Sequence, residues 1–275
     1  MPALSANEGD ADQDSFPLPL EKLEFELPGK SLYLDFDGTL VGIAPTPESI
    51  EIPSGLPRRL EALQQALDGA VAIVTGREIS DIEKFLPGFS GPVAGGHGSH
   101  MRTIDGRYVT SEIDPEPLRV IQREIAAYAQ SVDGLLAENK TAGCVLHYRQ
   151  VPDAAMEAHR FVDALIGNHD GFVTEAAKMA IEVRPESVTK AGALASIASS
   201  TPFSGRVPAY AGDDISDEPA FRWVNDRGGV SIRVGEGPTS AHYGVPSVTE
   251  FAGWIDSVLS TFTARTDRVT EEEKP

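Results

Sequence analysis

Short apolar runs alternate with helical patterns along most of the chain. The runs at 32–36 (LYLDF, apolar apart from Asp35) and 70–74 (AVAIV) are typical of buried strands. Between them, residues 55–67 place four leucines at helical spacing on one face. This alternation predicts a parallel sheet with helices on both faces.

The same alternation continues along the chain and returns near its end. Strand-like runs lie at 92–96, 207–212 and 229–235. Helical patterns lie beside them at 79–86 and 216–224. The predicted fold class is therefore α/β, with a doubly wound, Rossmann-like parallel-sheet core.

The middle of the chain has a different pattern. Two amphipathic helices are predicted at 117–131 and 153–167, with a strand-like run at 142–148 between them. Two further runs, 171–177 and 178–184, are expected to pair as a hairpin. This segment predicts an α+β cap inserted into the core.

The predicted domain organisation follows from these patterns. The cap is expected over 110–186, and the core over 23–109 and 187–262. Residues 1–22 are acidic and contain proline and serine, which is typical of a disordered arm. A similar acidic tail is expected over 263–275.

Composition narrows the partners and the compartment. The net charge of −19 argues against nucleic acid or an anionic membrane as a partner. No apolar run reaches the length of a membrane-spanning helix, and the N-terminus lacks the order of a secretory signal. Cys144 is the only cysteine, which excludes an internal disulfide. We expect a cytoplasmic monomer that acts on a small molecule.

Polar groups follow several predicted strands at the point where each strand ends. Asp35 and Asp37 close the first strand, and Thr75 closes the second. The pair Asp213-Asp214 closes the strand at 207–212. Ligands of open α/β sheets bind beyond these carboxyl ends, so the sequence predicts a binding site there.

Carboxylates gathered at one edge repel one another unless a cation lies between them. Mg²⁺ suits such a site, because it binds one or two carboxylates together with phosphate oxygens and water. Lys190, at the start of a predicted helix, would add positive charge beside a phosphate. The alternatives are that Asp35 is a turn residue, that Asp213-Asp214 caps a helix, and that Lys190 is solvated.

Four motifs occur in a fixed order: DFDGTL, VTGR, TKAG and GDDISDE. In this order they resemble the motifs of the haloacid dehalogenase superfamily of phosphotransferases. The resemblance implies that Asp35 attacks phosphorus and forms an aspartyl-phosphate, while Asp37 is the general acid and base. It implies that Thr75 and Lys190 bind the phosphoryl group. Gly76 and Arg77 are further phosphate candidates, although Arg77 could pair with an acidic neighbour instead.

The resemblance also implies a Mg²⁺ site. In the superfamily the metal is held by the nucleophile's carboxylate, the backbone carbonyl of the second aspartate and an acid of the last motif. Here these are Asp35, Asp37 and Asp213. The resemblance leaves Asp214 and Asp217 as inner ligands or as support for them.

A second set of segments is similar to trehalose-6-phosphate phosphatases: GGHGSHMR, AENKTAGCVLHYR and AIEVRP. The resemblance implies a sugar site lined by His97, Glu138, Lys140, His147, Arg149 and Glu182. The chain departs from the family pattern at Ser216, at TKAG and at HGSH, where Thr, Lys-Gly and His-Gly-Ala-Glu are common. The last departure affects the mouth between core and cap.

Alternatives remain for the sugar site and for the function. His147 and Arg149 share one face of a strand that could be solvated, and His97 could be an ordinary loop histidine. The function implied is Mg²⁺-dependent hydrolysis of trehalose 6-phosphate. The rivals are a phosphatase of sucrose phosphate, mannosyl-phosphoglycerate or glucosylglycerol phosphate, a sugar phosphomutase, and a sugar-phosphate-binding domain without activity.

Overall fold

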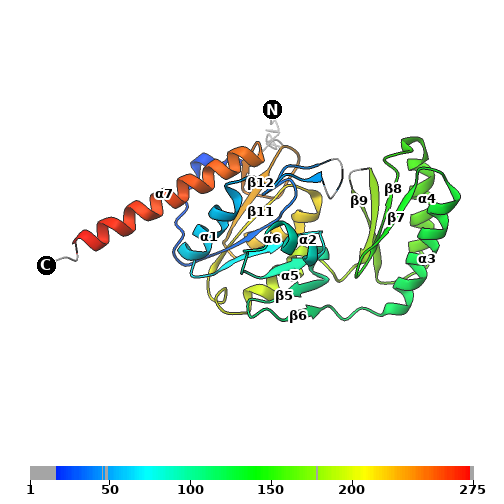
Figure 1. Ribbon diagram of the computed structural model, residues 1–275, viewed down its shortest axis with the longest axis horizontal. Helices are drawn as coiled ribbons and strands as arrows, with labels where there is room; N and C mark the ends of the chain where they lie inside the picture. The colour runs from blue at the N-terminus through cyan, green and yellow to red at the C-terminus, as the bar shows by residue number, and fades with distance from the viewer. Residues whose placement is uncertain (1–16, 45, 47–48, 178, 273–275) are drawn as a thin grey trace, which may run out of the picture.

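Two β-sheets form the centres of two layered units in the computed structural model (Figure 1). The structure describes residues 17–44, 46, 49–177 and 179–272. The larger sheet has nine strands and forms the core, and the smaller sheet has four and forms the cap.

The core sheet is parallel except at one edge. From β1 through β4 in spatial order every neighbouring pair is parallel, whereas β5 and β6 are antiparallel. In spatial order its strands are β1 (Leu18–Pro19), β13 (Tyr243–Val245), β12 (Val230–Val234), β11 (Val207–Gly212), β2 (Lys30–Leu34), β3 (Val71–Val74), β4 (Val93–Gly95), β5 (His100–Arg102) and β6 (Tyr108–Thr110).

Helices cover the core sheet on both faces. The strand order runs from β2 to β4 in one direction and from β2 through β11 to β12 in the other, so right-handed crossovers place α1 and α6 on opposite faces. Helix α1 packs against α7, and α5 packs against α6. The core helices are α1 (Leu56–Ala66), α2 (Ile79–Phe85), α5 (Lys190–Ala198), α6 (Glu218–Asn225) and α7 (Val248–Glu272).

The cap has one sheet and two helices. In Figure 1 helices α3 and α4 lie on the side of this sheet that is farther from the core. Buried side chains of Cys144, Leu146, Ile181 and Val183 pack with these helices, and burial raises the pKa of the Cys144 thiol to about 12. The elements are α3 (Pro115–Ser131), β7 (Leu136–Asn139), β8 (Cys144–His147), α4 (Ala155–Ile166), β9 (Phe172–Ala177) and β10 (Ala180–Pro185).

The predicted fold class is confirmed: the protein is an α/β protein with a doubly wound core and an inserted α+β cap. The predicted hairpin is confirmed as well, because β9 and β10 pair antiparallel. Within the described ranges, no helix is both long and apolar enough to span a membrane.

Three segments differ from the sequence-based expectation. Leu18–Lys22, expected in a disordered arm, form β1 and a 3-10 turn in which Leu20 is buried against the core; residues 1–16 of that arm lie outside the described residues. Helix α7 continues to Glu272 through most of the expected tail. Strand β6 ends at Thr110, so the first residue of the expected cap belongs to the core sheet.

Candidate active site

Asp35 lies directly beyond the carboxyl end of β2, at the centre of the core sheet. Only 4% of this residue is exposed. Its Oδ1 atom lies 3.0 Å from Nζ of Lys190, the first residue of α5. Thr189 fixes the start of that helix, because its hydroxyl accepts the backbone N–H of Gly192 at 3.0 Å. The helix start therefore delivers a buried ammonium to the carboxylate.

Asp217 is the second carboxylate that pairs with the Lys190 ammonium. Its Oδ1 accepts from Lys190 Nζ at 2.6 Å and from the hydroxyl of Tyr210, which lies within β11. Its Oδ2 accepts the backbone N–H groups of Asp213 and Asp214, each at 2.9 Å. Burial opposes ionisation, but the ammonium and these hydrogen bonds lower the pKa of Asp217. Asp217 therefore fixes the turn that carries Asp213.

Three carboxylates converge at this edge. One oxygen from each of Asp35, Asp213 and Asp217 lies within 4.8 Å of the others. Burial and then the Asp217 charge raise the pKa of Asp213 to about 7. Burial also raises the pKa of Asp35, although Lys190 opposes that shift. Two buried carboxylates and the half-buried Asp213 against one ammonium, all offering oxygen, fit a hard divalent cation.

Gly38 keeps space open beside this cluster. It has a φ of +72°, and a Cβ atom there would lie 1.9 Å from Oδ2 of Asp213. Any other residue would be strained at this φ and would displace the carboxylate. The glycine of the DFDGTL motif is therefore required by the approach of Asp213 to the turn after β2.

Asp37 lies apart from the three carboxylates and pairs with Arg77. The guanidinium donates two hydrogen bonds to it, from Nε at 2.6 Å and from Nη2 at 2.7 Å. The rings of Phe36 and Phe85 flank this guanidinium, with centroids at 5.8 and 5.3 Å. Thr75 is buried, and its Oγ1 accepts the backbone N–H of Arg77 at 3.2 Å. The structure thus assigns Arg77 an acidic neighbour, which was the alternative to phosphate contact.

The side chains of two aspartates named for the metal site, Asp37 and Asp214, lie outside the observed carboxylate cluster. Asp214 is exposed, and its Oδ1 accepts the backbone N–H of Ile215 at 2.7 Å as a helix cap. The Asp37 carboxylate is held by Arg77, and the sequence-based expectation placed only its backbone carbonyl on the metal. Asp217, which the expectation left as an inner ligand or as support, is the third member of the carboxylate cluster.

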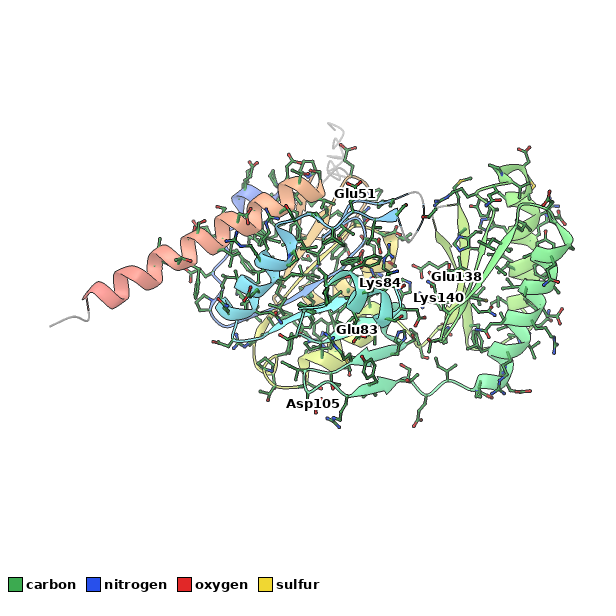
Figure 2. The ribbon with its side chains drawn as sticks, in the orientation of Figure 1. Glu51, Glu83, Lys84, Asp105, Glu138 and Lys140 are labelled. Atoms are coloured by element: carbon green, nitrogen blue, oxygen red, sulfur yellow. The ribbon has the colours of Figure 1, made fainter. Side chains whose placement is uncertain are left out.

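On the face opposite to its helices, the cap sheet carries a row of three glutamates and one valine. Glu138, Val145, Glu182 and Glu175 are consecutive partners across the four strands, so their side chains share one face. Figure 2 shows Glu138 and Lys140 on the side of the sheet that faces the core.

Glu182 connects this face to the core. Its Oε1 accepts from Lys140 Nζ at 2.8 Å, and its Oε2 lies 3.3 Å from Nε2 of His97. Burial opposes ionisation, but His97 and Lys140 lower the pKa of Glu182. Lys140 Nζ also donates to the backbone carbonyl of Gly76 at 3.3 Å. The structure therefore brings His97 and Gly76 of the core next to two of the expected sugar-binding residues of the cap.

The other expected sugar-site residues lie farther along the same sheet. His147 Nε2 lies 2.8 Å from Oε2 of Glu138, and this contact lowers the pKa of Glu138. Arg149 is exposed just beyond the end of β8.

Several residues of this region were not anticipated from the sequence. Tyr210 was treated only as part of a strand, and nothing in its local sequence indicates a contact with Asp217. Glu175 and Arg184 form an ion pair of 2.7 Å on the cap sheet. Alternation along 178–184 could have placed Arg184 on the same face as Glu182. Glu78 and Thr141 form a contact between core and cap, described below.

The fold, a doubly wound core with an inserted cap, is that of haloacid dehalogenase-like hydrolases. A solved haloacid dehalogenase-like hydrolase from Bacteroides thetaiotaomicron shares the fold, with a TM-score of 0.60 and 16% identity, over 86% of this chain and 98% of that one. A solved trehalose-6-phosphate phosphatase related protein has a TM-score of 0.71 at 27% identity, over 85% of this chain and 99% of that one.

The family described as Trehalose-phosphatase matches residues 33–249. A probable trehalose-phosphate phosphatase of Sinorhizobium fredii is 36% identical, covering 92% of this chain and 94% of that protein. The trehalose-6-phosphate phosphatase of Escherichia coli is 28% identical, covering 83% and 86%. The chain belongs to the trehalose-phosphatase family and is a phosphatase.

Proposed function

We propose that the protein hydrolyses trehalose 6-phosphate in a Mg²⁺-dependent reaction that passes through an aspartyl-phosphate on Asp35. The observation that carries the proposal is the buried Asp35 carboxylate, 3.0 Å from Lys190 and within a cluster of acids at the carboxyl edge of the sheet. All of these groups belong to the same chain, so the proposed reaction needs no residue from a second copy.

In the first step an Asp35 oxygen attacks phosphorus, and the bond from phosphorus to the sugar oxygen breaks. Asp37 donates a proton to the departing sugar oxygen. In the second step Asp37 removes a proton from water, which attacks the same phosphorus. The bond from phosphorus to the Asp35 oxygen breaks, which releases inorganic phosphate and restores the Asp35 carboxylate. Both oxygens of Asp37 accept hydrogen bonds from Arg77, so one of these bonds must open when Asp37 carries a proton, while the other keeps the side chain oriented.

Lys190 and Thr75 would bind the phosphoryl oxygens. Lys190 is almost fully buried, and Asp217 and Asp35 raise its pKa despite that burial, so it carries a fixed positive charge. Positive charge and hydrogen-bond donors at the phosphoryl group provide most of the stabilisation in phosphoryl transfer.

Asp35 and Asp213 would hold Mg²⁺ through carboxylate oxygens, together with the Asp37 carbonyl. Both oxygens of Asp217 already accept hydrogen bonds, so we assign it to holding Asp213 and Lys190 in place. When bound, the cation neutralises charge on the phosphoryl oxygens and on the acid cluster.

The cap face would bind the sugar. Glu138, Glu182 and Lys140 supply acceptors and donors, which sugar hydroxyls require in combination. The names of the Sinorhizobium fredii and Escherichia coli relatives, a probable trehalose-phosphate phosphatase and a trehalose-6-phosphate phosphatase, support trehalose 6-phosphate as the substrate.

A panel of glycosyl phosphates, assayed with Mg²⁺ and with chelator, tests the proposal. We expect phosphate release from trehalose 6-phosphate to exceed release from sucrose phosphate and from mannosyl-phosphoglycerate, and to stop when the chelator is present. Faster release from another glycosyl phosphate would reassign the substrate. Isomerised hexose phosphate without phosphate release would indicate a mutase.

A further inference from the structure

A short loop of the core and a short loop of the cap contact each other beside the carboxylate site. The core loop, Gly76–Glu78, follows Thr75. The cap loop, Lys140–Thr141, lies in the turn between β7 and β8. We call these contacts the clasp.

Glu78 makes most of the clasp. Its Oε1 accepts the backbone N–H of Thr141 at 3.1 Å, and its Oε2 accepts the Thr141 hydroxyl at 2.8 Å. The neighbouring Lys140 donates to the carbonyl of Gly76 at 3.3 Å. One carboxylate thus bonds to both the backbone and the side chain of the cap loop, which fixes the position of the loop as well as its distance.

The Glu78 carboxylate is itself held in place from the core. His100 Nε2, in β5, lies 3.1 Å from Oε2 of Glu78, and Ser99 Oγ lies 2.8 Å from Nδ1 of the same ring. Only 28% of the Glu78 side chain is exposed. These contacts, first that with His100, lower the pKa of Glu78 to about 2. The acceptor for the cap loop is therefore ionised and oriented near neutral pH.

The clasp lies between two functional parts of the molecule. On the core side, Arg77 lies between the clasp residues Gly76 and Glu78 in the sequence and pairs with Asp37. On the cap side, Lys140 reaches Glu182 on the face of the cap sheet. A movement of the Lys140–Thr141 loop would therefore change where the Lys140 ammonium lies relative to Glu138 and Glu182 on the cap sheet.

We propose that Glu78 is a positioning residue for substrate binding: through Thr141 it holds the cap loop on the core, and so places Lys140 for the sugar. The proposal rests on the proposed function in taking the sugar phosphate as substrate. A small aryl phosphate needs the carboxylate site but not the residues that bind the sugar. The clasp therefore contributes to turnover of the sugar phosphate alone.

The test compares Glu78→Ala with Glu83→Ala. Glu83 is a matched control on α2, because it bonds Arg102 and Tyr108 of the core and does not hold the cap loop (Figure 2). For Glu78→Ala we expect a rise in KM for trehalose 6-phosphate of about tenfold, since two charge-assisted hydrogen bonds are lost at a partly exposed site. Turnover of p-nitrophenyl phosphate should change less than about twofold. The Glu83 variant should keep both activities.

Amide hydrogen exchange gives a second readout that needs no substrate. The Thr141 N–H is the donor to Glu78, so its protection should fall in Glu78→Ala and stay unchanged in Glu83→Ala. Thr141→Val removes only the hydrogen bond from the hydroxyl. In the wild-type background it should raise KM less than Glu78→Ala does, and in the Glu78→Ala background it should not raise KM further.

Equal losses with both substrates, or unchanged Thr141 protection, would overturn the positioning role. Failure of the wild type to release phosphate from trehalose 6-phosphate would instead contradict the proposed function. The exchange comparison would then still decide whether the clasp holds the cap loop.

Discussion

At the residue scale, the site is built from acids whose neighbours give them different tasks. Asp35 is buried and Asp213 half-buried, and both have raised pKa values, whereas the pKa of Asp217 is lowered by the four hydrogen-bond donors that contact it. Asp37 is separate and bound to Arg77. The motif spacing predicted which aspartates gather at the strand ends. It could not separate Asp214 from Asp217, because that difference depends on the direction of each side chain in one turn.

Replacing Asp35 with Asn should abolish turnover while leaving the fold intact. The amide keeps the shape of the side chain but cannot attack phosphorus, so phosphate release should fall by more than about a thousandfold. Phosphate assays and thermal melting check this. Normal phosphate release by this variant would remove Asp35 from the nucleophile role.

Asp217→Asn and Asp214→Asn should differ sharply in stability. Asp217 is fully buried against Lys190, so its replacement leaves a buried ammonium poorly paired and should cost about 3 kcal/mol or more. Asp214 is an exposed cap, and Asn caps helices equally well, so its replacement should cost less than about 0.5 kcal/mol. Urea unfolding measures both. Equal losses would mean that the two aspartates are not distinguished as their contacts suggest.

At the element scale, most helices and strands followed from the sequence because their apolar spacing is strong. Helix α7 was not predicted, although Phe251, Trp254, Ile255 and Val258 have the helical spacing that would have indicated it. Strand β1 has only two residues, and its pairing with β13 depends on the distant end of the chain. The clasp was not predictable either, since Glu78 and Thr141 belong to segments 63 residues apart.

On the cap sheet, Glu138→Ala should reduce kcat/KM for the sugar phosphate by about ten- to a hundredfold and change aryl phosphate turnover by less than about twofold. Arg149→Ala should behave in the same way. The reason is that the proposed function places these side chains at the sugar and not at the phosphoryl group. Glu157→Ala, which removes an exposed ion pair with Arg160 on α4, is the control and should change neither activity. Equal losses with both substrates would place Glu138 and Arg149 outside the sugar site.

At the scale of the whole molecule, polar side-chain contacts join the core and the cap. Among the described residues they include the clasp and the contact of Glu182 in the cap with His97 in the core. The sequence predicted two units and which residues face the mouth between them. It could not predict that their acids and bases would pair with one another across it, because each partner lies in a different unit.

The clasp should make this junction sensitive to acid. The pKa of Glu78 is lowered from 4.5 to about 2, so its contribution is complete above about 4.5 and is lost as the pH falls toward 2. We expect Thr141 amide protection in the wild type to exceed that in Glu78→Gln near neutral pH, and the difference to shrink across this window. Exchange measured at several pH values would check it. A difference that is constant with pH would show that the ionised carboxylate is not what holds the loop.

The cap insertion also determines when the core can form during synthesis. The central strand β2 pairs with β11, yet Lys30–Leu34 and Val207–Gly212 are separated by the whole cap. A nascent chain that ends before residue 207 has no partner for one edge of β2. The strands of the cap pair within a single continuous segment, so the cap can fold on the ribosome first. The centre of the core sheet can form only after β11 has been synthesised.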